Sequence, residues 1–167
     1  MKTVLNILFL TFLALGSINA QDINMQNGTL SQCSGVLYDS GGATSSYTNN
    51  ESYTLTICSD AGDGTAVQLD FTFFETQINA DYLTIYDGSD ISANQIGIYS
   101  GANNPGIIQS TSASGCLTLT FISNSAISAT GFSANISCAT PCQDIDISIL
   151  TTPPVGIGGN VIIDQGT

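Results

Sequence analysis

The chain has 167 residues, with thirteen acidic residues, one basic residue and no histidine, for a formal net charge of −12 at pH 7. The basic residue is Lys2, so every residue from position 21 onward is neutral or acidic. A surface of one negative sign repels nucleic acid and anionic lipid, which excludes both as partners. The lack of histidine removes the usual base for a serine or cysteine nucleophile and the imidazole ligands of catalytic zinc, so we expect no catalysis by this chain.

The first twenty residues have the features of a secretory signal peptide. Lys2 precedes the apolar run Val4–Leu15, and Ser17–Ala20 provides small residues where a signal peptidase cleaves. The apolar run is shorter than the ~20 residues of a membrane-spanning helix, which favours a signal over an anchor. We therefore expect cleavage near Ala20, no membrane insertion, and a mature protein that is secreted or held at the cell surface.

Short runs of alternating apolar and polar residues follow one another along the chain, as in strands with one buried face. These runs are 54–57, 67–73, 82–86, 117–121 and 132–138, with Val67, Leu69, Phe71 and Phe73 sharing one face. Pairs such as Gly41-Gly42, Asp63-Gly64 and Asp87-Gly88 lie between the runs and are typical of turns. No segment after residue 20 has a helical period, so the pattern predicts an antiparallel β-sandwich.

Five cysteines in a secreted chain favour disulfides, and the odd number leaves one without a partner in this chain. Cys142 begins a segment with alternating Ile145–Ile149 and a second run, Val161–Ile163. These runs are too short to bury a core of their own. We expect residues 139–167 to be a linker and the truncated start of a further β-domain, with the partner of Cys142 missing. The alternative is an exposed thiol that cross-links two chains.

Five segments together resemble a CUB domain over residues 33–138. They are Cys33-Ser-Gly with Leu37-Tyr-Asp-Ser-Gly-Gly42, Tyr47-Thr-Asn-Asn-Glu51, Asp81-Tyr-Leu-Thr-Ile-Tyr-Asp-Gly88, Ser114-Gly-Cys-Leu-Thr-Leu-Thr-Phe121 and Gly131-Phe-Ser-Ala-Asn-Ile-Ser-Cys138. The chain looks most like the CUB modules of large surface or secreted proteins of Gram-negative bacteria. The resemblance implies a jelly-roll-like sandwich of two antiparallel sheets, preceded by an N-terminal segment, residues 21–32.

The resemblance also implies consecutive disulfides, Cys33–Cys58 and Cys116–Cys138. The second cysteine of the family usually lies about five residues earlier, near Tyr53, and is followed by a tryptophan. This chain has no tryptophan, and Leu55 stands where it would pack.

A calcium site at one end of the sandwich is common to many CUB domains. Carried over to this sequence, its ligands are Asp81, Glu51 (one residue out of register) and Asn124, where the family has an aspartate. Two carboxylates ~5 Å apart repel by roughly 3 kcal/mol at an effective dielectric of 20, and no basic residue is present to relieve this. Because affinity follows the number of carboxylates, we expect a weak site, about 10⁻⁴–10⁻³ M. The alternative is that Asp81 caps a loop and Glu51 is solvated. Asp39 and Asp87 are expected in turns.

The function expected from these features is that of a non-catalytic extracellular recognition or adhesion module. It would bind a protein or glycan at the calcium end through Glu51, Asp81 and Asn124, with Tyr47 and Tyr82 as nearby support. The acidic composition favours a partner that carries lysine or arginine. Two alternatives remain, an accessory domain of a secreted enzyme such as a peptidase, with its catalytic part beyond Thr167, and a structural spacer of a large adhesin.

Overall fold

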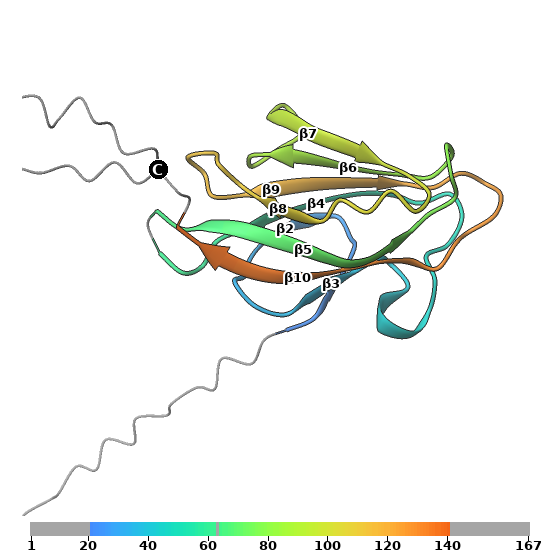
Figure 1. Cartoon of the computed structure of the whole chain (residues 1–167), viewed down its shortest axis with the longest axis horizontal. Helices are drawn as coiled ribbons and strands as arrows, with labels where there is room; N and C mark the ends of the chain where they lie inside the picture. The colour runs from blue at the N-terminus through green and yellow to red at the C-terminus, as the bar shows by residue number, and fades with distance from the viewer. Residues whose placement is uncertain (1–20, 63, 141–167) are drawn as a thin grey trace, which may run out of the picture.

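The computed structural model describes residues 21–62 and 64–140, which form a sandwich of two five-stranded sheets (Figure 1). The first sheet contains, in spatial order, β1 (Ile23–Asn24), β3 (Val36–Tyr38), β10 (Gly131–Ala139), β5 (Ala66–Glu75) and β8 (Ile107–Gln109). The second contains β2 (Gly28–Ser31), β4 (Ser52–Cys58), β9 (Leu117–Ile122), β6 (Tyr82–Asp87) and β7 (Asn94–Tyr99). One 3₁₀ turn, η1 (Gly42–Thr44), follows β3. The all-β sandwich of two sheets predicted from the sequence is confirmed.

The N-terminal segment belongs to the sandwich. β1 pairs with β3 and β2 pairs with β4, and both pairs are parallel, whereas every other pairing is antiparallel. Ile23 and Met25 are buried in the core. Residues 21–32, which the resemblance treats as a segment ahead of the domain, therefore supply an edge strand to each sheet. Within the described ranges no helix is long and apolar enough to cross a membrane.

The core is built from the inward faces of the central strands, as the alternation predicts. Leu83 and Ile85 of β6 and Leu117, Leu119 and Phe121 of β9 are fully buried. The prediction is wrong at Phe73, which is 43% exposed while its neighbour Phe74 is buried. The register of β5 and β10 shifts between Ser133 and Ala134. This β-bulge reverses which side chains face inward beyond it.

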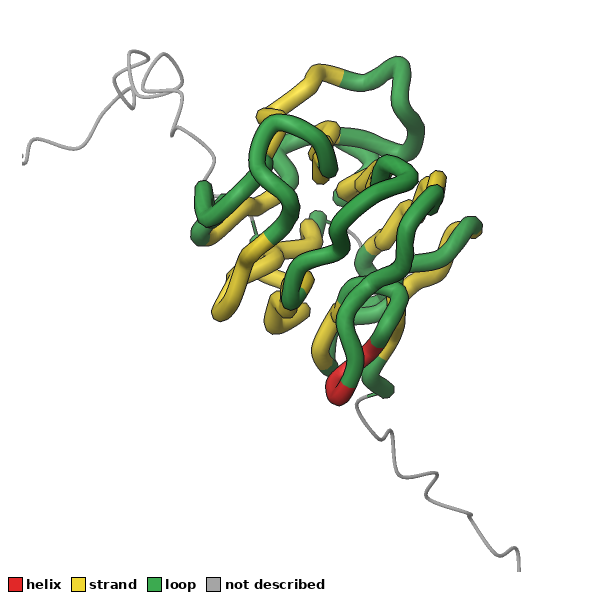
Figure 2. Tube along the Cα trace, turned by 90° about the vertical axis from the view of Figure 1, so that its right-hand side faces the viewer, coloured by secondary structure: helices red, strands yellow, loops and turns green. Residues whose placement is uncertain are grey.

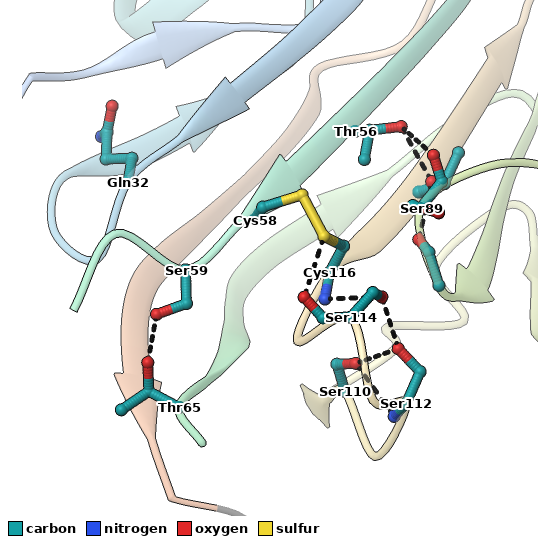
Figure 3. The surroundings of a disulfide bond; sticks show 12 residues. Gln32, Thr56, Cys58, Ser59, Thr65, Ser89, Ser110, Ser112, Ser114 and Cys116 are labelled. Carbon is teal, nitrogen blue, oxygen red and sulfur yellow. Dashed lines mark hydrogen bonds between the residues drawn. A yellow bond between two sulfur atoms is a disulfide. The ribbon is translucent and has the colours of Figure 1, made fainter. Parts of the chain in front are cut away.

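The disulfide pairing implied by the resemblance is wrong. The bridges are Cys58–Cys116 and Cys33–Cys138, not Cys33–Cys58 and Cys116–Cys138. Ile57 and Leu117 are register partners of β4 and β9, so the antiparallel register places Cys58 opposite Cys116 (Figure 3). The other bridge joins the connection after β2 to β10 and so links the two sheets. All four cysteines lie at one end of the sandwich, here called the cystine end. Cys142 and the expected further β-domain lie outside the described residues.

Candidate functional site

Three loops meet at the end of the sandwich opposite the disulfides, and Figure 2 looks onto this end. They are the β3–β4 loop (39–51), the β5–β6 loop (76–81) and the β9–β10 loop (123–130). Backbone hydrogen bonds tie the first loop to the third: Asn50 N–H donates to the Asn124 carbonyl at 2.7 Å, and Ser123 N–H donates to the Glu51 carbonyl at 3.0 Å. We call this the acidic loop end. Asp81, Glu51 and Asn124 all lie on it, as the resemblance predicts.

Asp81 is fully buried and holds the three loops together. Its Oδ2 accepts a hydrogen bond from the Tyr47 hydroxyl at 2.6 Å, and its Oδ1 accepts one from the Asn124 N–H at 2.8 Å. The Tyr47 oxygen in turn accepts the Gln77 N–H at 3.0 Å. Burial, together with the Asp81 hydrogen bond, raises the pKa of Tyr47 to about 12, so the phenol remains a donor. Each Asp81 oxygen thus has a protein donor.

Glu51 is also buried, but its carboxylate lies on the side of the β3–β4 loop. Oε1 accepts hydrogen bonds from the Ser40 hydroxyl at 2.6 Å and from both the N–H and the hydroxyl of Thr48 at 2.7 Å. Oε2 is buried and has no hydrogen-bond partner. A buried carboxylate oxygen without a donor is costly, because desolvation of the charge is not compensated.

Asn124 uses its side chain within the loops. Its Nδ2 donates to Gln77 Oε1 at 2.8 Å, and its Oδ1 accepts the Ala126 N–H at 2.7 Å. An uncharged pair of amides therefore lies beside Asp81, and the side-chain carbonyl of Asn124 is already engaged.

The three predicted calcium ligands do not form one coordination group in this structure. Glu51 is bonded to Ser40 and Thr48, while Asp81 is bonded to Tyr47 and Asn124. Across residues 21–62 and 64–140, no three His, Cys, Asp or Glu side chains gather closely enough to hold a metal ion. Calcium takes six to eight oxygen ligands, so the side chains that bind it must point toward one position. Glu51, Asp81 and Asn124 do not do so here, and they therefore do not fit a shared calcium site around Asp81.

The two predicted tyrosines differ in exposure. Tyr47 is 1% exposed, so any support that it gives to a ligand-binding surface is indirect, through its hydrogen bond to Asp81. Tyr82 is 37% exposed and lies opposite Ile122 in the β6–β9 register. Ile122 is itself exposed, as are Ile78 and Ile127 on the loops that the Asn124–Gln77 bond connects. Sequence reasoning missed these three isoleucines, since nothing in the alternation separates exposed from buried isoleucine.

Sequence reasoning also placed Asp39 only in a turn. It does accept the Gly41 N–H at 2.7 Å, but its other oxygen accepts the Phe132 N–H at 3.0 Å, and the residue is buried. Burial raises the pKa of the Asp39 carboxyl, the two backbone hydrogen bonds lower it, and the Glu51 charge raises it further, with a net upward shift. The Asp-x-Gly pattern indicates the turn, whereas the bond to Phe132, 93 residues away, leaves no local signal.

A surface pocket of about 280 Å³ opens beside Asp39. It is lined by η1 and its neighbours and by the start of β10, namely by Tyr38, Asp39, Gly42, Ala43, Thr44, Ser45, Ser46, Phe73, Thr130, Phe132 and Ser133. Its lining includes one of the buried acids of this end, Asp39.

Residues 27–136 match the CUB domain family. This chain belongs to that family. Neuropilin-1 of Gallus gallus is 38% identical over 88 residues, which are 52% of this chain and 9% of neuropilin-1. This chain therefore corresponds to a small part of that protein. The relatives are animal proteins, so the bacterial type expected from the sequence is not supported by them.

Several solved structures share the fold. The full extracellular region of zebrafish Gpr126/Adgrg6 superposes with a TM-score of 0.58 at 19% identity, over 70% of this chain and 15% of that chain. The MASP-1 CUB2 domain bound to Ca²⁺ superposes with a TM-score of 0.53 at 21% identity, over 67% of this chain and 98% of that chain. At such identities the likeness concerns the fold. CUB domains are typically non-catalytic extracellular binding modules, and the two disulfides of this chain are consistent with an extracellular location.

Proposed function

We propose that this CUB domain recognises a protein ligand at the acidic loop end, through exposed apolar side chains that the buried Asp81 network holds in place. The observation that carries the proposal is the pair Tyr82 and Ile122, which are register partners on the outer face of the second sheet and are 37% and 52% exposed. Exposed aromatic and aliphatic side chains beside ordered loops are typical of interaction surfaces. A glycan ligand is the alternative, in which Tyr82 would stack on a sugar ring.

The charge of the chain favours a partner with lysine or arginine. No residue from position 21 onward is basic, so the field around the domain has one sign and attracts cationic surfaces. Asp81 and Glu51 are buried, so they do not offer a direct ion pair at the surface. In the proposed recognition, Asp81 and Glu51 order the loops. Exposed acidic residues elsewhere on the domain increase the rate at which it associates with a cationic partner.

Weak calcium dependence of this binding is part of the proposal. Two observations support it: a MASP-1 CUB2 domain of the same fold is bound to Ca²⁺, and Glu51 Oε2 has no donor. A site with few carboxylates is expected to have a dissociation constant of about 10⁻⁴–10⁻³ M.

A screen of extracellular protein fragments and a glycan array, both in millimolar calcium, tests the proposal on the full chain. For any ligand found, Tyr82→Ala and Ile122→Ala are expected to weaken binding about tenfold or more. Ile107→Ala is the matched control, because Ile107 is 65% exposed on β8 of the other sheet. Equal losses in Ile122→Ala and Ile107→Ala would contradict the proposed surface. The absence of any ligand would favour the alternative roles, a spacer or an accessory domain in a larger protein.

A further inference from the structure

The pocket beside η1 has two aromatic side chains on the outer face of the first sheet. Tyr38 of β3 and Phe73 of β5 are both register partners of Ser133 in β10, and all three line the pocket. Register partners share a face and neighbouring strands lie about 4.8 Å apart, so the two rings stand on either side of a small serine. Phe73 is 43% exposed because the β-bulge turns it outward. An exposed ring in this position can stack on a ligand.

The η1 loop forms the remaining wall of the pocket, and Asp39 fixes it in place. Asp39 accepts the Gly41 N–H at 2.7 Å through Oδ1 and the Phe132 N–H at 3.0 Å through Oδ2, which joins the loop to β10. The Gly42 N–H donates to the Asp39 carbonyl at 3.1 Å. Residues 44–46 add only neutral, hydroxyl-bearing side chains. The pocket is therefore held open by the fold, with an acidic residue in its lining.

A second carboxylate stands at the rim of the pocket and is open to solvent. Glu75 is exposed, and its Oε2 accepts a hydrogen bond at 2.6 Å from the hydroxyl of Thr130, which lines the pocket. Glu75 and Phe73 are two residues apart on β5, so they project from the same face of the sheet. Unlike the buried Asp39, Glu75 can form a direct ion pair with a ligand. No residue from position 21 onward is basic, so no side chain of the domain competes for it.

Aromatic rings beside carboxylates favour a cationic ligand. A cation over the face of a ring is attracted by the ring quadrupole, and the single negative sign of the domain disfavours anions. The guanidinium of arginine is planar, stacks on aromatic faces and presents five N–H donors to carboxylate and hydroxyl oxygens. The ammonium of lysine is compact and strongly hydrated. A lining of rings, hydroxyls and carboxylates therefore fits arginine better than lysine.

We infer that this pocket binds an arginine side chain of the protein partner, with the guanidinium stacked against Phe73 and paired with Glu75. The inference rests on the proposed function in that the partner is a protein with basic residues, and it names the side chain and its place. The pocket lies on the first sheet, whereas Tyr82 and Ile122 lie on the outer face of the second. The two surfaces can therefore be tested separately.

Titration of the full chain with Nα-acetyl-arginine amide, followed by two-dimensional NMR of the backbone amides, tests the pocket. The amide signals of Thr130 and Ser133, which line it, are expected to shift and to saturate. Nα-acetyl-citrulline amide is the matched control probe, because it has a neutral urea in place of the guanidinium. This probe and Nα-acetyl-lysine amide are each expected to bind about threefold more weakly or worse.

Two variants locate the interaction, and two others control for charge and apolar surface. Glu75→Gln and Phe73→Ala are each expected to weaken binding of the arginine probe about threefold or more. Asp70→Asn removes one acid from the same strand outside the pocket lining, and Ile107→Ala removes an exposed apolar side chain from β8. Both controls should stay within about twofold of wild type. Glu75 and Phe73 are exposed, so their variants should fold, which melting curves check.

Four outcomes would overturn the inference. They are no shift with the arginine probe, equal affinity for the citrulline or lysine probe, equal losses in Glu75→Gln and Asp70→Asn, and binding of methyl mannoside in place of arginine, which would assign the pocket to a glycan. Ile122→Ala should bind the arginine probe like wild type. A ligand from the screen that is lost in Ile122→Ala but unaffected by Glu75→Gln would leave the proposed recognition surface standing and remove the arginine pocket from it.

Discussion

Two carboxylates, Asp87 at the cystine end and Glu51 at the acidic loop end, differ in the hydrogen-bond donors that the fold gives them. At the cystine end Asp87 is partly buried, and desolvation alone would raise its pKa, but hydrogen bonds from Thr111, Ser110 and Ser112 outweigh this and lower it. The donors include the Ser110 hydroxyl at 2.7 Å and the N–H groups of Thr111 and Ser112 at 3.0 and 3.1 Å. At the acidic loop end Glu51 keeps a buried oxygen with no donor. The fold supplies donors to both oxygens of Asp87, whereas it supplies donors to only one oxygen of Glu51.

The largest effect is expected from crowding the acidic loop end. Gly131 has φ +100°, and a Cβ at this position would overlap Asp39 Oδ2. Gly131→Ala should therefore lower the free energy of unfolding by about 3 kcal/mol or more, from overpacking and left-handed backbone strain together. Urea denaturation measures the loss.

Gly106→Ala is the control for that substitution. Gly106 has φ +70°, and a Cβ there would meet nothing within 4 Å. Only the backbone strain of about 1–2 kcal/mol should appear. Equal losses of unfolding free energy in the two variants would show that the overlap with Asp39 contributes nothing to the effect of Gly131→Ala.

At the cystine end, Asp87→Ala should cost about 2–3 kcal/mol, because it leaves several donors around positions 110–112 without their charged acceptor. The lowered pKa of Asp87 also sets a pH dependence. Its stabilisation is fully present above the ordinary value of 3.8 and is lost as pH falls through the lower folded-state pKa. Denaturation at a series of acidic pH values should therefore show a smaller acid-induced loss in Asp87→Asn than in wild type. A slope unchanged by the substitution would contradict this account of the cystine end.

Tyr47→Phe should cost about 1–3 kcal/mol, since it leaves Asp81 Oδ2 without a donor and the Gln77 N–H without an acceptor. The measurement is the free energy of unfolding in urea, compared with that of Tyr82→Phe. Tyr82 is partly exposed, and its hydroxyl has no such network, so that change should stay within about 0.5 kcal/mol. Similar losses for both tyrosines would mean that the Asp81 network does not hold the loops.

Two features could be predicted from the sequence. They are the buried faces of most strands and the position of Glu51, Asp81 and Asn124 at one end of the sandwich. Alternation follows from the pleat, so Leu83, Ile85 and Leu119 could be placed in the core from period alone. The reversal at Phe73 depends on a bulge against β10, which has no local signature in β5. The disulfide partners depend on the register of β4 and β9, and that register comes from the whole sandwich rather than from cysteine spacing.

The side-chain environments of the acids could not be predicted for the same reason. Asp39 and Asp87 both precede Ser or Gly in turn-like sequences. Asp39, however, lies close to Gly131 and accepts the Phe132 N–H, whereas Asp87 is surrounded by donors from residues 110–112. These contacts join positions far apart in the chain. A resemblance transfers positions to a new sequence, but the direction of a carboxylate depends on the neighbours that the fold brings to it.

The most direct test compares the thermal stability of wild type and Glu51→Gln in chelator and in calcium. With chelator, Glu51→Gln should melt at or above the temperature of wild type, because the substitution removes a buried charge whose Oε2 has no donor and keeps an oxygen for the donors on Oε1. With calcium at ten times its dissociation constant, wild type should gain about 5 °C and Glu51→Gln should gain nothing. If Glu51→Gln is less stable than wild type by the same amount in both conditions, Glu51 is a structural acid and the cation site does not exist.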